Sequence, residues 1–102
     1  STLGQRLEEI LKEKLPKLNE VVFSISAPEA KDVYVAGDFN NWQLDNHSRM
    51  ELDGGMWQKR TNLVSGKYRY RFVIDGRWTE DLNNSIKETN PYGAMDSLIE
   101  VD

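Results

Sequence analysis

Residues 67–74 alternate in side-chain character at every position but one. In an extended strand, the large apolar side chains that share one face are Tyr68, Tyr70, Phe72 and Ile74. The opposite face carries Lys67, Arg69, Arg71 and Val73. A period of two is that of a β-strand with one buried face and does not fit a helix. The segment therefore predicts a strand whose apolar face joins a core, so the rest of the chain must supply partner strands.

Six further segments have strand character and are bounded by turn residues; they are residues 21–26, 33–36, 50–52, 56–63, 77–79 and 98–101. Asp53-Gly54-Gly55 and Asp75-Gly76 are hairpin signals, because tight hairpin turns need positive φ angles. Residues 40–49 and 81–90 are polar and predict loops. Seven short strands with turns every ~8–12 residues are typical of an antiparallel β-sandwich.

The N-terminal segment has a different period. Apolar residues recur at steps of three and four, at Leu3, Leu7, Ile10, Leu11, Leu15 and Leu18. This spacing predicts a short amphipathic helix that ends near Lys14 or Leu15, because Pro16 cannot continue the hydrogen-bond ladder. We expect this helix within residues 1–19 and a β-sandwich domain over residues 20–102. So short a helix needs cover for its apolar face, from the domain, from a partner protein or by self-association.

Composition excludes several classes of site. The 102 residues suit one domain. No cysteine is present, which rules out disulfides and thiolate metal sites, and His47 alone is too little for a histidine zinc site. The net charge of −4 argues against nucleic-acid binding. No apolar run approaches the ~18 residues of a membrane span, and the N-terminus lacks a signal-peptide pattern. We therefore expect a cytoplasmic protein without a cofactor or a membrane partner.

Two of the three tryptophans occupy positions typical of a sugar site. Trp42 lies in a polar loop and Trp78 follows the Asp75-Gly76 turn, whereas Trp57 lies within a strand and predicts core packing. An exposed indole face suits the apolar C–H face of a glucose ring, and covering it contributes about 1–2 kcal/mol. Packing of both indoles against loops is the alternative. Residues expected to donate hydrogen bonds to sugar hydroxyls are Arg71, Asn83, Asn84 and Lys87.

Three motifs resemble those of the family 48 carbohydrate-binding modules. Residues 33–42 (VYVAGDFNNW) are similar to the first signature and residues 68–78 (YRYRFVIDGRW) to the second. Residues 91–101 (PYGAMDSLIEV) are similar to the closing strand and the loop before it. The family includes the glycogen-binding domain of the AMP-activated protein kinase β subunit. It also includes the N-terminal modules of isoamylases, pullulanases and branching enzymes.

The resemblance implies an immunoglobulin-like, early-set sandwich that binds α-1,4-linked glucan such as glycogen or starch. In the family two tryptophans cradle the sugar, and they fall on Trp42 and Trp78. Arg71 takes the place of a ligand-binding Lys, and Tyr92 that of an apolar residue supporting the sugar. Asp96 takes the place of a ligand-binding Asn, and an ionised Asp accepts hydrogen bonds but does not donate them.

The sequence supports three functional hypotheses. The first is a non-catalytic module that targets an attached or associated protein to α-glucan. The second is a protein-interaction domain on the same fold that has lost its sugar site. The third is a small glycosidase using Asp75 with Glu80 or Asp81. We expect no enzyme activity, because carboxylates in glycine-containing turns usually form the turn, and a small sandwich offers no deep cleft.

Overall fold

The computed structural model describes residues 16–102 as strands, turns and one short 3₁₀ helix, η1 (Asp38–Asn40). The strands are β1 (Asn19–Ser26), β2 (Val33–Gly37), β3 (Glu51–Asp53), β4 (Met56–Leu63), β5 (Gly66–Ile74), β6 (Arg77–Thr79), β7 (Lys87–Thr89) and β8 (Met95–Val101). The predicted N-terminal helix, up to Lys14 or Leu15, lies outside the described residues. Within residues 16–102, no helix is long and apolar enough to cross a lipid bilayer.

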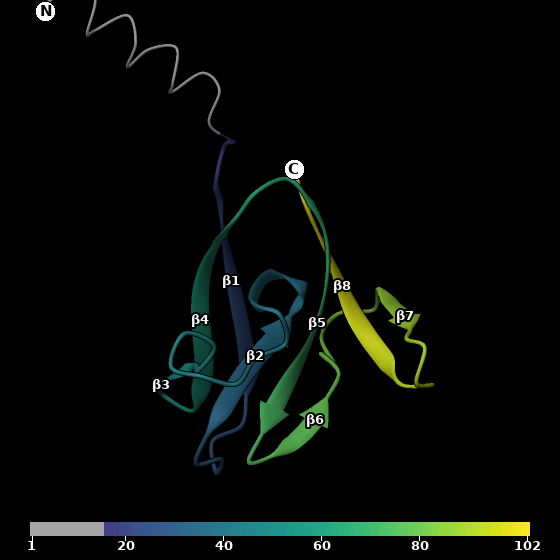
Figure 1. Cartoon of the computed structure of the whole chain (residues 1–102). Coiled ribbons are helices and arrows are strands. Elements are labelled where there is room, and N and C mark those ends of the chain that lie inside the picture. The colour runs from purple at the N-terminus through teal and green to yellow at the C-terminus, as the bar shows by residue number, and fades with distance from the viewer. Residues whose placement is uncertain (1–15) are drawn as a thin grey trace, which may run out of the picture.

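The strands form two antiparallel sheets, which Figure 1 shows side by side. One sheet has the order β1-β4-β3. The other has the order β2-β5-β8-β7, and β6 also pairs with β5. The chain crosses between the sheets three times, between β1 and β2, between β2 and β3, and at the arc between β4 and β5 (Figure 1). This arrangement is the predicted antiparallel sandwich and is compatible with an immunoglobulin-like one.

Both sheets contribute to one hydrophobic core, whose buried members are Phe23, Val33, Val35, Met50, Trp57, Tyr70 and Phe72. Phe23 packs edge-on against Tyr70 with ring centroids 4.9 Å apart, which joins β1 to β5 across the sandwich. Trp57 is buried as predicted, and its indole N–H donates to the carbonyl of Ala27 at 2.8 Å. Burial of these side chains is the main force that holds the two sheets together.

The strand predicted for residues 67–74 is confirmed, with one face in the core and the other outside it. Tyr70 and Phe72 are buried in the core, while Arg69 and Arg71 lie on the outer face of the five-stranded sheet. Register places Val73 opposite Trp78 on β6, so the indole of Trp78 also lies on this outer face. The same strand therefore holds the core on one side and a set of cations and an indole on the other.

The C-terminal part of the chain corrects two of the sequence expectations. Residues 81–90 were predicted as a polar loop, yet Lys87–Thr89 form β7, which pairs with Met95–Ser97. The last strand also begins earlier than the predicted residues 98–101, at Met95. β7 has no apolar alternation of its own and forms because β8 offers an unpaired edge. In the resulting β7–β8 hairpin, β8 lies beside β5 and β7 forms the edge of the sheet (Figure 1).

Candidate functional site

The loop that carries Trp42 is fixed by close packing at its start. A Cβ atom on Gly37 would lie 2.5 Å from the carbonyl oxygen of Arg69, so only glycine allows β2 to approach β5 here. Asn40 then locks the turn: its amide donates to the carbonyl of Val35 at 2.9 Å, and its oxygen accepts the N–H of Gly37 at 2.9 Å. The motif glycine and asparagine thus shape the backbone that leads to the tryptophan.

Trp42 itself has a strained backbone. Its φ is 60° and that of Asn41 is 57°, in the left-handed region. Asparagine tolerates this region, but a bulky residue there is an outlier that its surroundings must hold in place. The Trp42 N–H donates to the carbonyl of Gly37 at 3.0 Å, which closes the turn. In this conformation the Trp42 side chain lines the same groove as Arg69 and Arg71 of β5.

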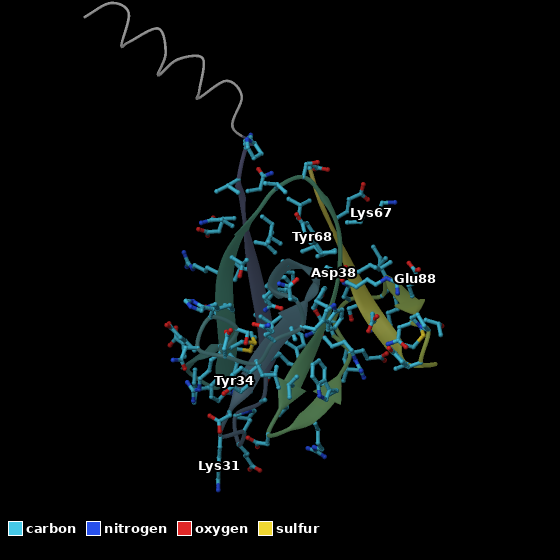
Figure 2. The ribbon with its side chains drawn as sticks, viewed as in Figure 1. Lys31, Tyr34, Asp38, Lys67, Tyr68 and Glu88 are labelled. Atoms are coloured by element: carbon cyan, nitrogen blue, oxygen red, sulfur yellow. The ribbon has the colours of Figure 1, made fainter. Side chains whose placement is uncertain are left out.

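Asp38 is the residue that fixes the indole. Its Oδ1 accepts the Nε1–H of Trp42 at 3.1 Å, and its Oδ2 accepts the backbone N–H of Arg69 at 2.8 Å. The carboxylate thereby connects the Trp42 side chain to β5; Figure 2 labels Asp38 beside this strand. A charge-assisted hydrogen bond of this kind is stronger than a neutral one.

Trp78 forms a pair with Trp42. The two ring centroids lie 6.4 Å apart with an angle of 35° between the planes, and Trp78 is 41% exposed. Arg71 lies beside them, its guanidinium carbon 5.9 Å from the centre of the Trp78 ring, within cation–π range. The Nε of Arg71 is buried and has no hydrogen-bond partner among the described residues.

Tyr92 stands at the tip of the β7–β8 hairpin. Asn90 builds the turn: its side-chain oxygen accepts the N–H of Tyr92 at 2.9 Å and that of Ala94 at 3.0 Å. Gly93 completes the turn with a φ of 84°. Tyr92 is 95% exposed, so its ring is free to contact a ligand.

These side chains enclose one groove of about 570 Å³. Its lining consists of Asp38, Trp42, Arg69, Arg71, Trp78, Asn90, Pro91, Tyr92 and Asp96. The structure thus brings together five of the residues predicted for a sugar site, namely Trp42, Arg71, Trp78, Tyr92 and Asp96. They come from the loop after η1, from β5, β6 and β8, and from the β7–β8 turn.

Asp96 differs from the others in being almost fully covered, with 3% of its surface exposed. Its Oδ1 accepts the side-chain amide of Asn90 at 3.3 Å, and its Oδ2 lies 3.8 Å from Nη1 of Arg69. Arg69 also forms an ion pair with Glu88 of β7. The carboxylate therefore forms part of the floor of the groove, held by neighbouring side chains.

Three other predicted residues do not line the groove. Lys87 is largely covered and donates to the carbonyl of Asp81 at 2.7 Å. The Asn84 amide donates to the Tyr70 hydroxyl at 3.1 Å and to the carbonyl of Leu98 at 2.8 Å, and Asn83 contributes its backbone N–H to Asp81. These contacts hold the loop between β6 and β7 onto the sheet. Sugar contacts by Asn83, Asn84 and Lys87 stay predictions.

The same loop caps a buried tyrosine. Burial raises the pKa of the Tyr70 hydroxyl well above its ordinary value of 10.0, while the hydrogen bond from Asn84 acts in the opposite direction. The hydroxyl donates to Oδ2 of Asp81 at 2.7 Å. Asp81 therefore has a structural partner, as does Asp75, whose Oδ1 accepts the backbone N–H groups of Lys31 and Asp32. Among residues 16–102, no three His, Cys, Asp or Glu side chains are grouped to hold a metal ion.

Sequence reasoning missed Asp38, Arg69 and Asn90 as members of the site. A signal was present for two of them. Asp38 lies within the motif that ends at Trp42, and Arg69 shares the outer face of β5 with Arg71. Asn90 gave no such signal, because its role depends on the β7–β8 hairpin, which the sequence did not predict.

Comparison with known proteins adds a family to this geometry. Residues 20–102 match the family model described as the glycogen recognition site of AMP-activated protein kinase. A 1,4-alpha-glucan branching enzyme of Francisella philomiragia is 31% identical over 83 residues, which cover 79% of this chain and 12% of the enzyme. The corresponding enzyme of Deinococcus radiodurans is 34% identical over 75 residues, covering 74% of this chain and 10% of the enzyme.

A solved structure shows the same fold. The crystal structure of a maltogenic amylase from S. marinus aligns with a TM-score of 0.68 at 21% identity, over 84% of this chain and 14% of the amylase. The chain thus spans only about an eighth of the length of the enzymes it matches.

Proposed function

This chain belongs to the family of the glycogen recognition site of AMP-activated protein kinase, and from that premise we propose that it binds α-1,4-linked glucan without catalysing a reaction on it. The observation that carries the proposal is the pair of indoles, 6.4 Å apart, on one groove that Arg71 also lines. We also infer that the sandwich is of the early-set, immunoglobulin-like type.

The angle between the indoles suits a curved ligand. An α-1,4 linkage turns each glucose ring relative to the next, so successive rings present their C–H faces at an angle rather than in one plane. The planes of Trp42 and Trp78 differ by 35°, which lets each indole cover a different ring. A flat, extended polysaccharide such as a β-1,4 glucan would contact the two faces less evenly.

Groups around the indoles orient the bound sugar. The guanidinium of Arg71 donates to sugar hydroxyls, and Tyr92 covers the ligand from the β7–β8 turn. Two platforms worth about 1–2 kcal/mol each supply at most about 4 kcal/mol, which corresponds to a dissociation constant of about 1 mM before the cost of association, so the polar contacts must add to the affinity and the site is weak. Such affinity suits a module that tethers a protein to a polymer offering many equivalent sites.

We propose that the module brings an attached or associated protein to the polysaccharide. Two of the relatives are 1,4-alpha-glucan branching enzymes, and the matched regions cover 12% and 10% of them. A small accessory domain within a longer protein is consistent with these proportions. A protein partner or self-association through residues 1–19, and a cytoplasmic location, stay predictions.

The test is titration calorimetry with maltoheptaose on the wild type, Trp42→Ala and Trp78→Ala. The wild type binds, and each substitution weakens binding at least about tenfold, because one aromatic platform is lost. Leu82→Ala is the matched control. Leu82 is 78% exposed and lies outside the groove, so this variant binds maltoheptaose with the wild-type affinity. Circular dichroism checks that all four proteins are folded.

Absence of heat at millimolar maltoheptaose would overturn the proposal. The domain would then be assigned to the alternative, a protein-interaction module on the same fold.

A further inference from the structure

Arg69 lies where three strands meet on the outer face of the five-stranded sheet. It belongs to β5 and is paired in register with Leu98 of β8. Its guanidinium forms ion pairs with Glu88 of β7 and with Asp96 of β8. Figure 2 labels Glu88 on β7, at the side of the sheet away from β2. One side chain therefore connects the strand that carries Arg71 to both strands of the hairpin that carries Tyr92.

The two carboxylates that Arg69 contacts face each other. Glu88 and Asp96 are register partners in the β7–β8 pair, so their side chains leave the sheet on the same face. Like charges directly opposite on neighbouring strands destabilise the pairing. The repulsion is stronger here because the Asp96 side chain is only 4% exposed and poorly screened by water. A cation that reaches both carboxylates removes this repulsion, and Arg69 is placed to do so.

β7 depends on this contact more than a longer strand would. It has three residues, pairs only with β8 among the described strands, and forms the edge of its sheet. So short a strand gains little from its backbone hydrogen bonds and needs side-chain contacts to stay docked. The turn after β7 holds Asn90, whose side chain hydrogen-bonds both to Asp96 and to the backbone of Tyr92.

We propose that Arg69 is a positioning residue of the groove: by neutralising Glu88 and Asp96 it holds the β7–β8 hairpin on the sheet and so sets where Tyr92 stands relative to the two indoles. Its effect on ligand binding rests on the proposed function, whereas its effect on the hairpin does not. In this arrangement Asp96 acts on the sugar through Arg69 and Asn90 rather than by direct contact.

Arg69→Gln tests the proposal by removing the charge while keeping a long polar side chain. Hydrogen exchange in the absence of sugar, read by mass spectrometry over residues 87–95, becomes faster by about tenfold or more, because local opening of the hairpin is easier. Affinity for maltoheptaose falls by about tenfold as Tyr92 loses its position. Exchange of the core residues stays at the wild-type rate, because opening of the hairpin leaves the core packed.

Arg60→Gln is the matched control. Arg60 lies in β4 of the other sheet and forms an ion pair with Glu20 at 3.6 Å, with both side chains largely exposed. Its substitution leaves exchange over residues 87–95 and the affinity unchanged. A change of the same size in this control would mean that loss of any arginine loosens the hairpin, and would overturn the proposal.

A rescue variant tests whether charge repulsion is what loosens the hairpin. Adding Glu88→Gln and Asp96→Asn to Arg69→Gln leaves three neutral side chains and no repulsion, so slow exchange over residues 87–95 returns to within about threefold of the wild type. Unchanged exchange in Arg69→Gln would overturn the proposal. If binding weakens in Arg69→Gln while exchange stays unchanged, Arg69 itself donates to the sugar and the proposal is wrong. If the wild type binds no maltoheptaose, the proposed function fails and the exchange measurements alone decide the role of Arg69.

Discussion

At the scale of single residues, Asp38 determines the orientation of Trp42. A tryptophan with a φ of 60° has an unfavourable backbone, which costs on the order of 1–3 kcal/mol. The carboxylate of Asp38 offsets part of this cost by accepting hydrogen bonds from the indole and from the N–H of Arg69. One charged residue thus positions an aromatic platform relative to the strand that carries the groove's cations.

Asp38→Asn is expected to weaken glucan binding while leaving the fold intact. The amide keeps one acceptor oxygen, so only one of the two hydrogen bonds survives, at a cost of about 1 kcal/mol. Titration calorimetry with maltoheptaose then shows an affinity about fivefold lower than that of the wild type. Asp53→Asn, on the exposed edge strand β3, is the control and keeps the wild-type affinity. Equal affinities for wild type and Asp38→Asn would show that the carboxylate has no part in orienting the indole.

At the scale of elements, two turns at one end of the sandwich are fastened to each other. Asp75 and Gly76 have φ values of 47° and 83° and form the tight turn between β5 and β6. Oδ1 of Asp75 accepts the backbone N–H groups of Lys31 and Asp32, each at 2.9 Å, and its own N–H donates to the carbonyl of Asp32. Figure 2 labels Lys31 at this end of the molecule. The turn that leads to Trp78 is thus held by the turn between β1 and β2.

This fastening is sensitive to acid. Backbone hydrogen bonds from Asp32 and Lys31 hold the pKa of the Asp75 carboxyl below its ordinary value of 3.8. A depressed pKa in the folded state means that the stabilisation is complete above 3.8 and is lost as the pH falls through the folded-state pKa. The wild type is therefore more stable than Asp75→Asn at neutral pH, and the difference shrinks in strong acid. Urea unfolding at a series of pH values measures it, and a difference independent of pH would contradict this account.

At the scale of the whole molecule, β5 joins the core to the groove. Phe72 is fully buried in the core, and its neighbour Arg71 faces the groove on the opposite side. Because successive side chains of a strand point to opposite faces, the packing of the core sets the position of the groove's cations. The part of the groove that β5 forms therefore rests directly on the core.

Phe72→Ala is expected to lower the free energy of unfolding by about 3–5 kcal/mol, because it leaves a cavity at the centre of the core. For a domain of this size, such a loss is a large share of the total stability. Leu52→Ala, at a position 50% exposed on β3, is the control and changes stability by about 0.5 kcal/mol or less. Urea denaturation measures both. A loss below about 1 kcal/mol for Phe72→Ala would show that the core collapses around the gap.

Much of the fold follows from local patterns in the sequence. The alternation in residues 67–74 and the Asp-Gly turns predict strands and hairpins, because side-chain period and φ preference are properties of a few neighbouring residues. The three motifs likewise predict Trp42, Trp78 and Arg71 as members of one site, and the structure brings them to one groove. Their role as sugar contacts stays a proposal for the experiments above.

Other features depended on contacts between distant parts of the chain. Lys87–Thr89 have no pattern of a strand and form β7 only because the edge of β8 lies beside them. Asn84 and Lys87 looked like free polar loop residues, yet their donors are taken up by Leu98 and Asp81 on the folded sheet. The sequence by itself therefore determined seven of the eight described strands, the tight turns and the aromatic positions. Only the tertiary structure decided which polar groups face the groove, because long-range pairing has no local signature.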